Sequence, residues 1–160
     1  MATPTYDLLD SVTLASSASS VTFSSIDQSY GDLIFVFEGT GSSTGYSTLQ
    51  VNGDTASNYS QVEMRGNGSS ASSLAFTANT LINRPVFISG NRVMLTSQLM
   101  DYSATDKHKT VLSRGGTENT ETVAIAARWA NTAAITSITM NFSNFAAGST
   151  FYLYGIAKAL

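Results

Sequence analysis

The chain has 160 residues, of which 42% are hydrophobic and 12% charged, and its formal net charge is −3; these values exclude a disordered chain and predict a single domain over residues 1–160. Its eight lysine and arginine residues are scattered singly, which excludes the basic patch that nucleic-acid binding requires. The absence of cysteine excludes disulfides, thiol catalysis and thiolate metal sites.

Short runs with a period of two residues recur along the whole chain, whereas helical periodicity is nearly missing. In chain order, the segments predicted as strands are 6–14, 19–26, 32–39, 47–54, 59–66, 73–77, 84–89, 92–102, 108–114, 121–130, 135–142 and the closing stretch TFYLYGI. Roughly ten to twelve short strands separated by turns predict an all-β fold. We expect a two-sheet antiparallel β-sandwich that is jelly-roll-like.

One segment, TVAIAARWANTAA (122–134), also fits a short helix, because it contains six alanines. Its larger side chains, from Val123 to Trp129, nevertheless fall at every second position. This alternation favours a strand.

Two of the predicted strands, DLIFVF and TFYLYGI, are apolar on both faces. In the closing strand, Phe151 and Leu153 lie on one face, while the opposite face carries Tyr152, Tyr154 and Ile156. Only one face of a sandwich strand meets the core, so the other face needs a second cover. We expect a homo-oligomer, a dimer or a trimer, or another stable partner; a long loop folded over the outer face is the alternative.

Two stretches, 39–48 and 66–73, consist mainly of glycine and hydroxyl residues and are predicted to be exposed loop tips. Asn52 and Gly53 predict a tight hairpin turn, because both residues tolerate positive φ. The N-terminus lacks the pattern of a signal peptide, and the longest apolar run, LIFVF, is too short to span a membrane. We therefore expect a soluble protein, made in a cytoplasm and not bound to a membrane.

No catalytic, cofactor-binding or metal-binding residue is assigned. His108 lies between two lysines that lower its basicity, and we expect it at the surface near the start of a strand. Glu63, Glu118 and Glu121 are the acids considered for a glycosidase pair, but their spacing is not distinctive. We therefore predict that the protein is not an enzyme and uses no cofactor.

Three sets of residues could bind calcium, glycans or sugars. Asn52, Asp54 and Asn58 offer oxygens for calcium, but their spacing does not match a calcium loop. Asn58, Asn67 and Asn141 begin N-x-S matches, which carry glycans only in a eukaryotic secretory route. A carbohydrate-binding module remains a rival, for which the stacking side chains would be Tyr46, Tyr59, Tyr102 and Trp129.

Several stretches together resemble small β-sandwich virion proteins of tailed bacteriophages, particularly those that infect cyanobacteria and marine bacteria. The stretches are ASSVTFSSIDQSYGDLIFVFEG, VNGDTASNYSQVEMRG, DKHKTVLSRGG, WANTAAITSITM and FAAGSTFYLYGIAKA. The resemblance covers almost the whole chain, and its most specific part is the closing FAAGSTFYLYGI. It implies a virion structural protein without catalytic residues.

Within that family, the unit is either a separate capsid decoration, or cement, protein or the head domain of a tail fibre. Only five residues precede the first predicted strand, so an adaptor and shaft are not expected. A decoration protein on the capsid surface is therefore favoured, with the major capsid protein as partner. A tail-fibre or receptor-binding tip is the alternative.

Overall fold

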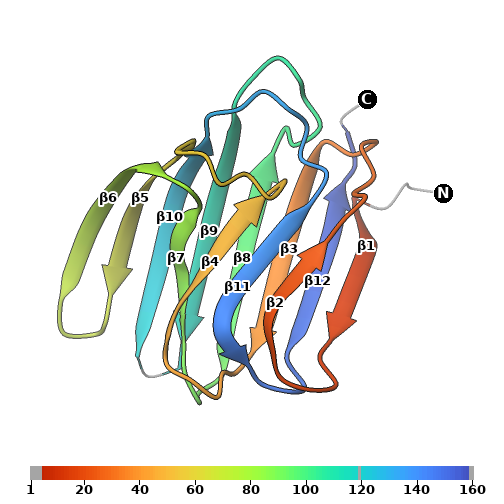
Figure 1. Ribbon diagram of the computed structural model, residues 1–160. Helices are drawn as coiled ribbons and strands as arrows, with labels where there is room; N and C mark the ends of the chain where they lie inside the picture. The colour runs from red at the N-terminus through yellow and green to blue at the C-terminus, as the bar shows by residue number, and fades with distance from the viewer. Residues whose placement is uncertain (1–4, 119, 159–160) are drawn as a thin grey trace.

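The computed structural model describes residues 5–118 and 120–158. Twelve β-strands form two antiparallel sheets, one with eight strands and one with four (Figure 1). The predicted two-sheet β-sandwich is thus confirmed, and each predicted strand overlaps an observed one. Among the described residues, none forms a helix of the length and apolarity that crossing a membrane requires.

The larger sheet occupies one layer of the sandwich, with every neighbouring pair of strands antiparallel. From one edge to the other it contains β1 (Tyr6–Thr13), β12 (Thr150–Ile156), β3 (Asp32–Gly39), β8 (Val93–Met100), β9 (Lys109–Thr117), β10 (Glu121–Trp129), β5 (Tyr59–Gly66) and β6 (Ala71–Asn79). The segment with the helical alternative is therefore strand β10.

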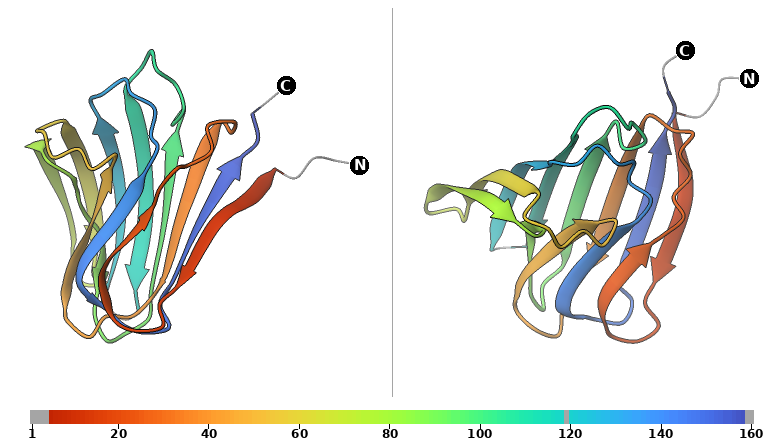
Figure 2. Two further views of the ribbon diagram at one scale, coloured as in Figure 1. Left: turned by 45° about the vertical axis from the view of Figure 1, so that its right-hand side comes forward. Right: turned by 45° about the horizontal axis from the view of Figure 1, so that its top comes forward.

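The smaller sheet covers part of the larger one. Its strands, in spatial order, are β2 (Ala18–Phe23), β11 (Ile138–Phe145), β4 (Gly45–Val51) and β7 (Ile82–Ile88). The edge strand β7 contacts β8, β9, β10 and β5, and the rest of the β5–β6 hairpin extends beyond it (Figures 1 and 2).

The strand order contains a jelly roll with two additions. Four strands of each sheet, in the orders β1-β12-β3-β8 and β2-β11-β4-β7, make up this jelly roll. With the β5–β6 and β9–β10 hairpins set aside, the chain changes sheet at every connection except that from β4 to β7, which is jelly-roll connectivity. Both hairpins join the larger sheet on its β8 side, where β9 pairs with β8 and β5 pairs with β10, so they double its width without a matching addition to the smaller sheet.

The core lies between the two sheets and is rich in aromatic rings. Phe145 of the smaller sheet packs against two rings of the larger sheet, with centroid distances of 5.3 Å to Phe37 and 5.1 Å to Phe151. All three rings are fully buried. Edge-to-face and tilted contacts of this kind add stabilisation beyond the area they bury.

The closing strand is an interior strand of the larger sheet. β12 pairs with β1 on one side and β3 on the other. Phe151 and Leu153 point into the core, and Tyr152 and Tyr154, which alternate with them, point to the other side. Residues near the end of the chain are thus needed to join β1 to the rest of the sheet.

Two predictions about connections are wrong. The stretch 39–48 is not an exposed tip: Gly41 is buried, and a Cβ there would lie 2.5 Å from the ring of Phe142. The Asn52-Gly53 turn exists, with φ of 52° and 61°, but it joins β4 to β5 in different sheets and is not a hairpin. The other predicted tip, 66–73, is largely exposed as expected.

Candidate functional site

The broadest candidate surface is the side of the larger sheet turned away from the smaller sheet, which we call the outer face. Directly paired residues on neighbouring strands point to the same side of a sheet, so the registers sort this face into rows. One row, the middle row, crosses all eight strands as Leu8, Tyr154, Ile34, Gln98, Leu112, Ala126, Val62 and Ala75. Only Gln98 interrupts its apolar character.

Large apolar side chains on this face are open to solvent. Their exposed fractions are 56% for Leu8, 54% for Val62, 63% for Met64, 54% for Met94 and 44% for Leu112. None of the segments in 5–118 and 120–158 crosses the outer face, because the connecting loops lie at the ends of the strands (Figures 1 and 2). The alternative of a covering loop is therefore wrong for this part of the chain.

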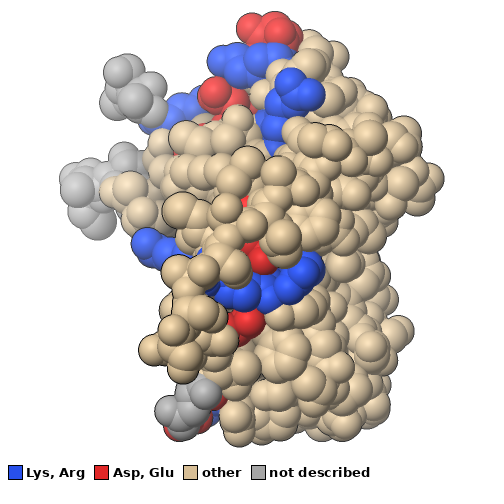
Figure 3. Space-filling view, turned by 90° about the vertical axis from the view of Figure 1, so that its left-hand side faces the viewer, with Lys and Arg blue, Asp and Glu red and all other residues tan. Residues whose placement is uncertain are grey.

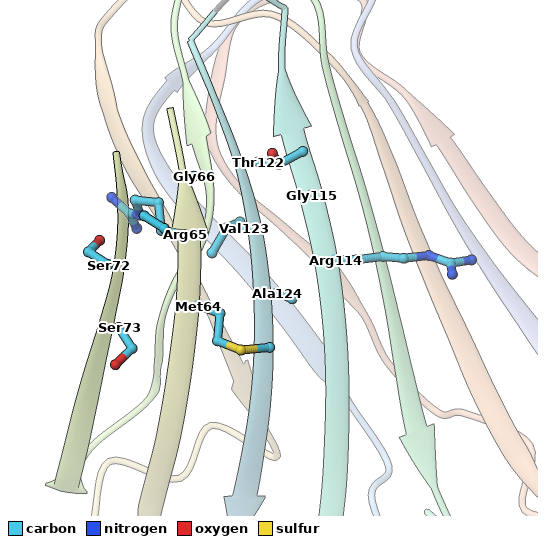
Figure 4. A pocket seen from close by; sticks show the side chains of 11 residues that line it. Met64, Arg65, Gly66, Ser72, Ser73, Arg114, Gly115, Thr122, Val123 and Ala124 are labelled. Carbon is cyan, nitrogen blue, oxygen red and sulfur yellow. The ribbon is translucent and has the colours of Figure 1, made fainter. Parts of the chain in front are cut away.

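The two halves of the outer face differ in side-chain size. The jelly-roll half, β1-β12-β3-β8, presents Tyr154, Tyr152, Ile34 and Val36. The hairpin half, β9-β10-β5-β6, presents mainly small side chains around an open hollow of about 760 Å³. Figure 4 shows Met64 leaning over Ala124 in this hollow, with Arg114 extending away from it over the neighbouring strand.

The two halves also differ in charge. Asp32 and Glu38 lie on β3 in the jelly-roll half, while Arg114 and Arg128 lie on β9 and β10 in the hairpin half. Within the part of the chain that the structure describes, the two arginines form no ion pair. Glu38 pairs with Arg92, which lies directly before β8, so Asp32 is the acid of the jelly-roll half that faces no described cation, and the two arginines lie in the other half of the same surface.

The opposite, inner side of the β5 region holds a buried charge cluster. Arg65 lies 2.7 Å from Glu63 and 3.2 Å from Glu121, and Arg84 lies 3.8 Å from Glu63. The guanidinium carbons of Arg65 and Arg84 lie 4.3 and 4.1 Å from the ring centroid of Tyr46. Figure 3, which looks at this side of the molecule, shows basic and acidic atoms gathered in a band among uncharged residues.

The composition of the cluster indicates a structural role, in which it connects the two sheets. Its two arginines and two glutamates cancel in formal charge, and the carboxylates of Glu63 and Glu121 are both engaged by Arg65. Tyr46 lies on β4 and the acids lie on β5 and β10, so the cluster ties the edge of the smaller sheet to the larger sheet. Arg84 takes a φ of 58°, which is unusual for a residue with a side chain, and its stacking on Tyr46 holds it there.

The acids considered for catalysis separate in the structure. Glu63 and Glu121 meet around Arg65, whereas Glu118 is exposed outside this cluster. Sequence reasoning missed the two arginines. One feature of the sequence could have predicted the ion pair. Glu63 and Arg65 lie two residues apart on one strand, so their side chains share a face.

The remaining candidate residues are placed as follows. His108 is exposed directly before β9, as expected. Tyr59, Tyr102 and Trp129 are buried, with exposed fractions of 1%, 0% and 1%, so they provide no stacking surface for a sugar. Tyr46, the fourth residue of that set, is flanked by arginines.

The oxygens considered for calcium form hydrogen bonds within the fold. Asp54 accepts from the indole of Trp129 at 2.7 Å and from the amide of Asn58 at 2.8 Å, and Asn52 accepts from backbone amides of residues 136 and 137. Hydrogen bonds to the ionised form, with that from Asn58 the largest, lower the pKa of Asp54. Among residues 5–118 and 120–158, no three metal-ligating side chains gather.

Comparisons with known proteins identify no family. No protein-family model matches the chain, and no curated protein matches it. One similar solved structure is the marine PL-14 alginate lyase from Aplysia kurodai, at 12% identity and a TM-score of 0.34 over 84% of this chain and 72% of that chain. A similarity at this level carries no argument about activity.

Proposed function

We propose that this protein is a non-enzymatic structural component of a bacteriophage virion that binds the outer surface of the capsid shell as an oligomer. The exposed apolar outer face is the observation that carries the oligomeric part of the proposal, because a contiguous apolar sheet surface marks a protein–protein interaction site. The resemblance of the sequence to small virion β-sandwich proteins supports the same function. The proposed location is the capsid surface, after synthesis in the host cytoplasm.

Stabilisation of the shell would follow from mass action. A protein that binds the assembled shell but not its separated subunits raises the free energy of disassembly. A specific contact requires about 800 Å² on each partner. The surface contains many of the 44 serine and threonine residues and few charges, which suits dense packing of copies on a shell.

Counting copies in purified virions by quantitative mass spectrometry tests this proposal. We expect hundreds of copies per particle, and shells stripped of the protein should withstand less heat than shells to which the recombinant protein is added back. The separated major capsid protein serves as the control, because it should bind weakly. A copy number of a few dozen or fewer would contradict capsid decoration.

A tail-fibre tip is the second candidate, favoured by the β5–β6 hairpin. This hairpin extends past the smaller sheet, and its turn at residues 67–70 is exposed and held by the Asn67 side chain, which accepts from two serine amides. Rigid projecting loops of this kind suit receptor contacts. Binding of the purified protein to host cells, together with a low copy number, would support this function over decoration.

A further inference from the structure

We infer that a second copy of this chain covers the outer face, related by a two-fold axis that runs parallel to the strands between β8 and β9. The inference rests on the proposed function, because it names the partner of the same surface. Four features of the face carry it: the strand order, the sizes of facing side chains, their charges and the available area.

The strand order determines which strands of the two copies face each other. The point between β8 and β9 is the centre of the eight strands. A two-fold axis along the strands at this point turns the jelly-roll half of one copy onto the hairpin half of the other. Strand β3 then lies over β10, β12 over β5 and β1 over β6. The rotation does not shift positions along the strand direction, so residues of the same row face each other.

Side-chain sizes in the middle row match under this operation. Ile34 faces Ala126 and Leu8 faces Ala75, so two of the four pairs combine a large residue with a small one; the other two pairs are Tyr154 with Val62 and Gln98 with Leu112. Interfaces of specific dimers pack to the density of protein interiors, which requires such complementarity.

The neighbouring row adds one pairing of a large residue with a small one. Val36 faces Ala124, the small residue at the floor of the hollow, and Tyr152 faces Met64 beside it. The hollow of one copy thus receives the bulky half of the other copy. Because the operation is two-fold, the fit occurs twice in the dimer.

One pair of opposite charges also faces across the axis, whereas Arg114 on β9 faces Thr96 on β8. Asp32 precedes Ile34 by two residues on β3, and Arg128 follows Ala126 by two residues on β10. The two strands run in opposite directions, so both groups lie on the same side of the middle row and face each other. Each dimer would contain this Asp32–Arg128 contact twice, with Arg128 contributing a side chain that has no ion pair among the described residues.

The face has the area that a stable dimer needs. Eight strands at about 4.8 Å and seven residues at about 3.4 Å make a surface of roughly 900 Å² per copy. Specific interfaces bury about 800 Å² per partner. The four jelly-roll strands alone would supply only about half of this area, so the two added hairpins make the face large enough.

Charge reversal tests the pairing, measured by sedimentation velocity on the full chain. Arg128→Asp and Asp32→Arg each place like charges opposite one another twice, and each should weaken the dimer by at least about 100-fold. An equimolar mixture of the two variants restores both attractive contacts, so we expect a dimer to reappear. A two-fold axis across the strands would place each strand over itself, so Asp32 and Arg128 would not face each other, and mixing the two variants would give no recovery beyond the behaviour of each variant alone.

Two further variants separate loss of the interface from loss of folding. Asp32 accepts hydrogen bonds from Gln98 and from the amide of residue 101, so Asp32→Arg also perturbs the fold. Met64→Asp alters an exposed outer-face residue and should dissociate the dimer with an unchanged circular dichroism spectrum. Leu74→Asp is the matched control: Leu74 is 42% exposed but pairs with Glu63 and points to the inner side, so it should remain dimeric.

A wild-type monomer at about 0.1 mM, a stable trimer, or equal effects of Met64→Asp and Leu74→Asp would overturn the inference. The outcome is separable from that for the proposed function. A monomer that still coats virions would overturn the dimer and the oligomeric state in the proposed function, but not the capsid role. A dimer that is absent from virions would overturn only the capsid role.

Discussion

The guanidinium of Arg65 lies 2.7 Å from the carboxylate of Glu63, and both side chains are at least nine-tenths buried. Replacing the arginine by methionine would leave a buried carboxylate whose remaining cation, Arg84, is 3.8 Å away. We expect Arg65→Met to lower the free energy of unfolding by about 3–5 kcal/mol, measured by urea denaturation. The double variant Arg65→Met with Glu63→Leu should lose less than the single variant. Equal losses of unfolding free energy in the single and double variants would contradict this prediction.

Gly155 on β12 is covered by the ring of Tyr30. A Cβ at position 155 would lie 2.4 Å from Cγ of that ring, whereas a Cβ at Gly90 would meet nothing within 4 Å. We expect Gly155→Ala to destabilise the protein by about 1–3 kcal/mol, because the ring must move. Gly90→Ala is the control and should change stability by less than about 0.5 kcal/mol. Thermal melts compare the two, and similar melting temperatures for both would contradict the prediction.

Asp54 should contribute to the pH dependence of stability. Its folded-state pKa is lowered, first by the hydrogen bond from Asn58 and also by that from Trp129. The stabilisation is therefore present above the unfolded pKa, about 3.9, and is lost as pH falls through the lower folded value. We expect the difference in unfolding free energy between wild type and Asp54→Asn to shrink from pH 6 towards pH 2. A difference that stays constant over this range would contradict the assignment.

The closing strand should be essential for folding. β12 lies between β1 and β3, and it brings Phe151 and Leu153, with exposed fractions of 0% and 1%, into the core. Removing residues 151–160 should therefore abolish the cooperative thermal transition. Removing only residues 158–160 is the control, because it leaves β12 complete. A soluble, cooperatively melting product of the longer deletion would contradict this prediction.

The sequence carried enough information to locate the strands. Alternation of apolar and polar residues is a local property, and it identified β3, β5 and β10 nearly to the residue. The doubly apolar strands β3 and β12 also predicted that apolar side chains would lie on both faces of the larger sheet. Those predictions needed no knowledge of which strand lies beside which.

The buried charge cluster and the packed loop were beyond sequence reasoning. Glu63 and Glu121 are 58 positions apart, and only the β5–β10 pairing brings them to the same arginine. Gly41 looked like part of a flexible tip because glycine is common in exposed turns. Its real constraint is the Phe142 ring, which approaches from a strand about 100 residues later.

A period of two residues dictates which side chains share a face, and it can be read from the sequence. The sequence therefore sufficed to predict an all-β chain with an interior closing strand and more apolar surface than one core can bury. Tertiary structure alone decided the order of the strands, the attachment of both hairpins to one side of the larger sheet, and the placement of Asp32 and two arginines in opposite halves of its outer face. The physical reason is that strand pairing depends on contacts between distant segments, whose free energies are set by the assembled sheet and not by any local stretch.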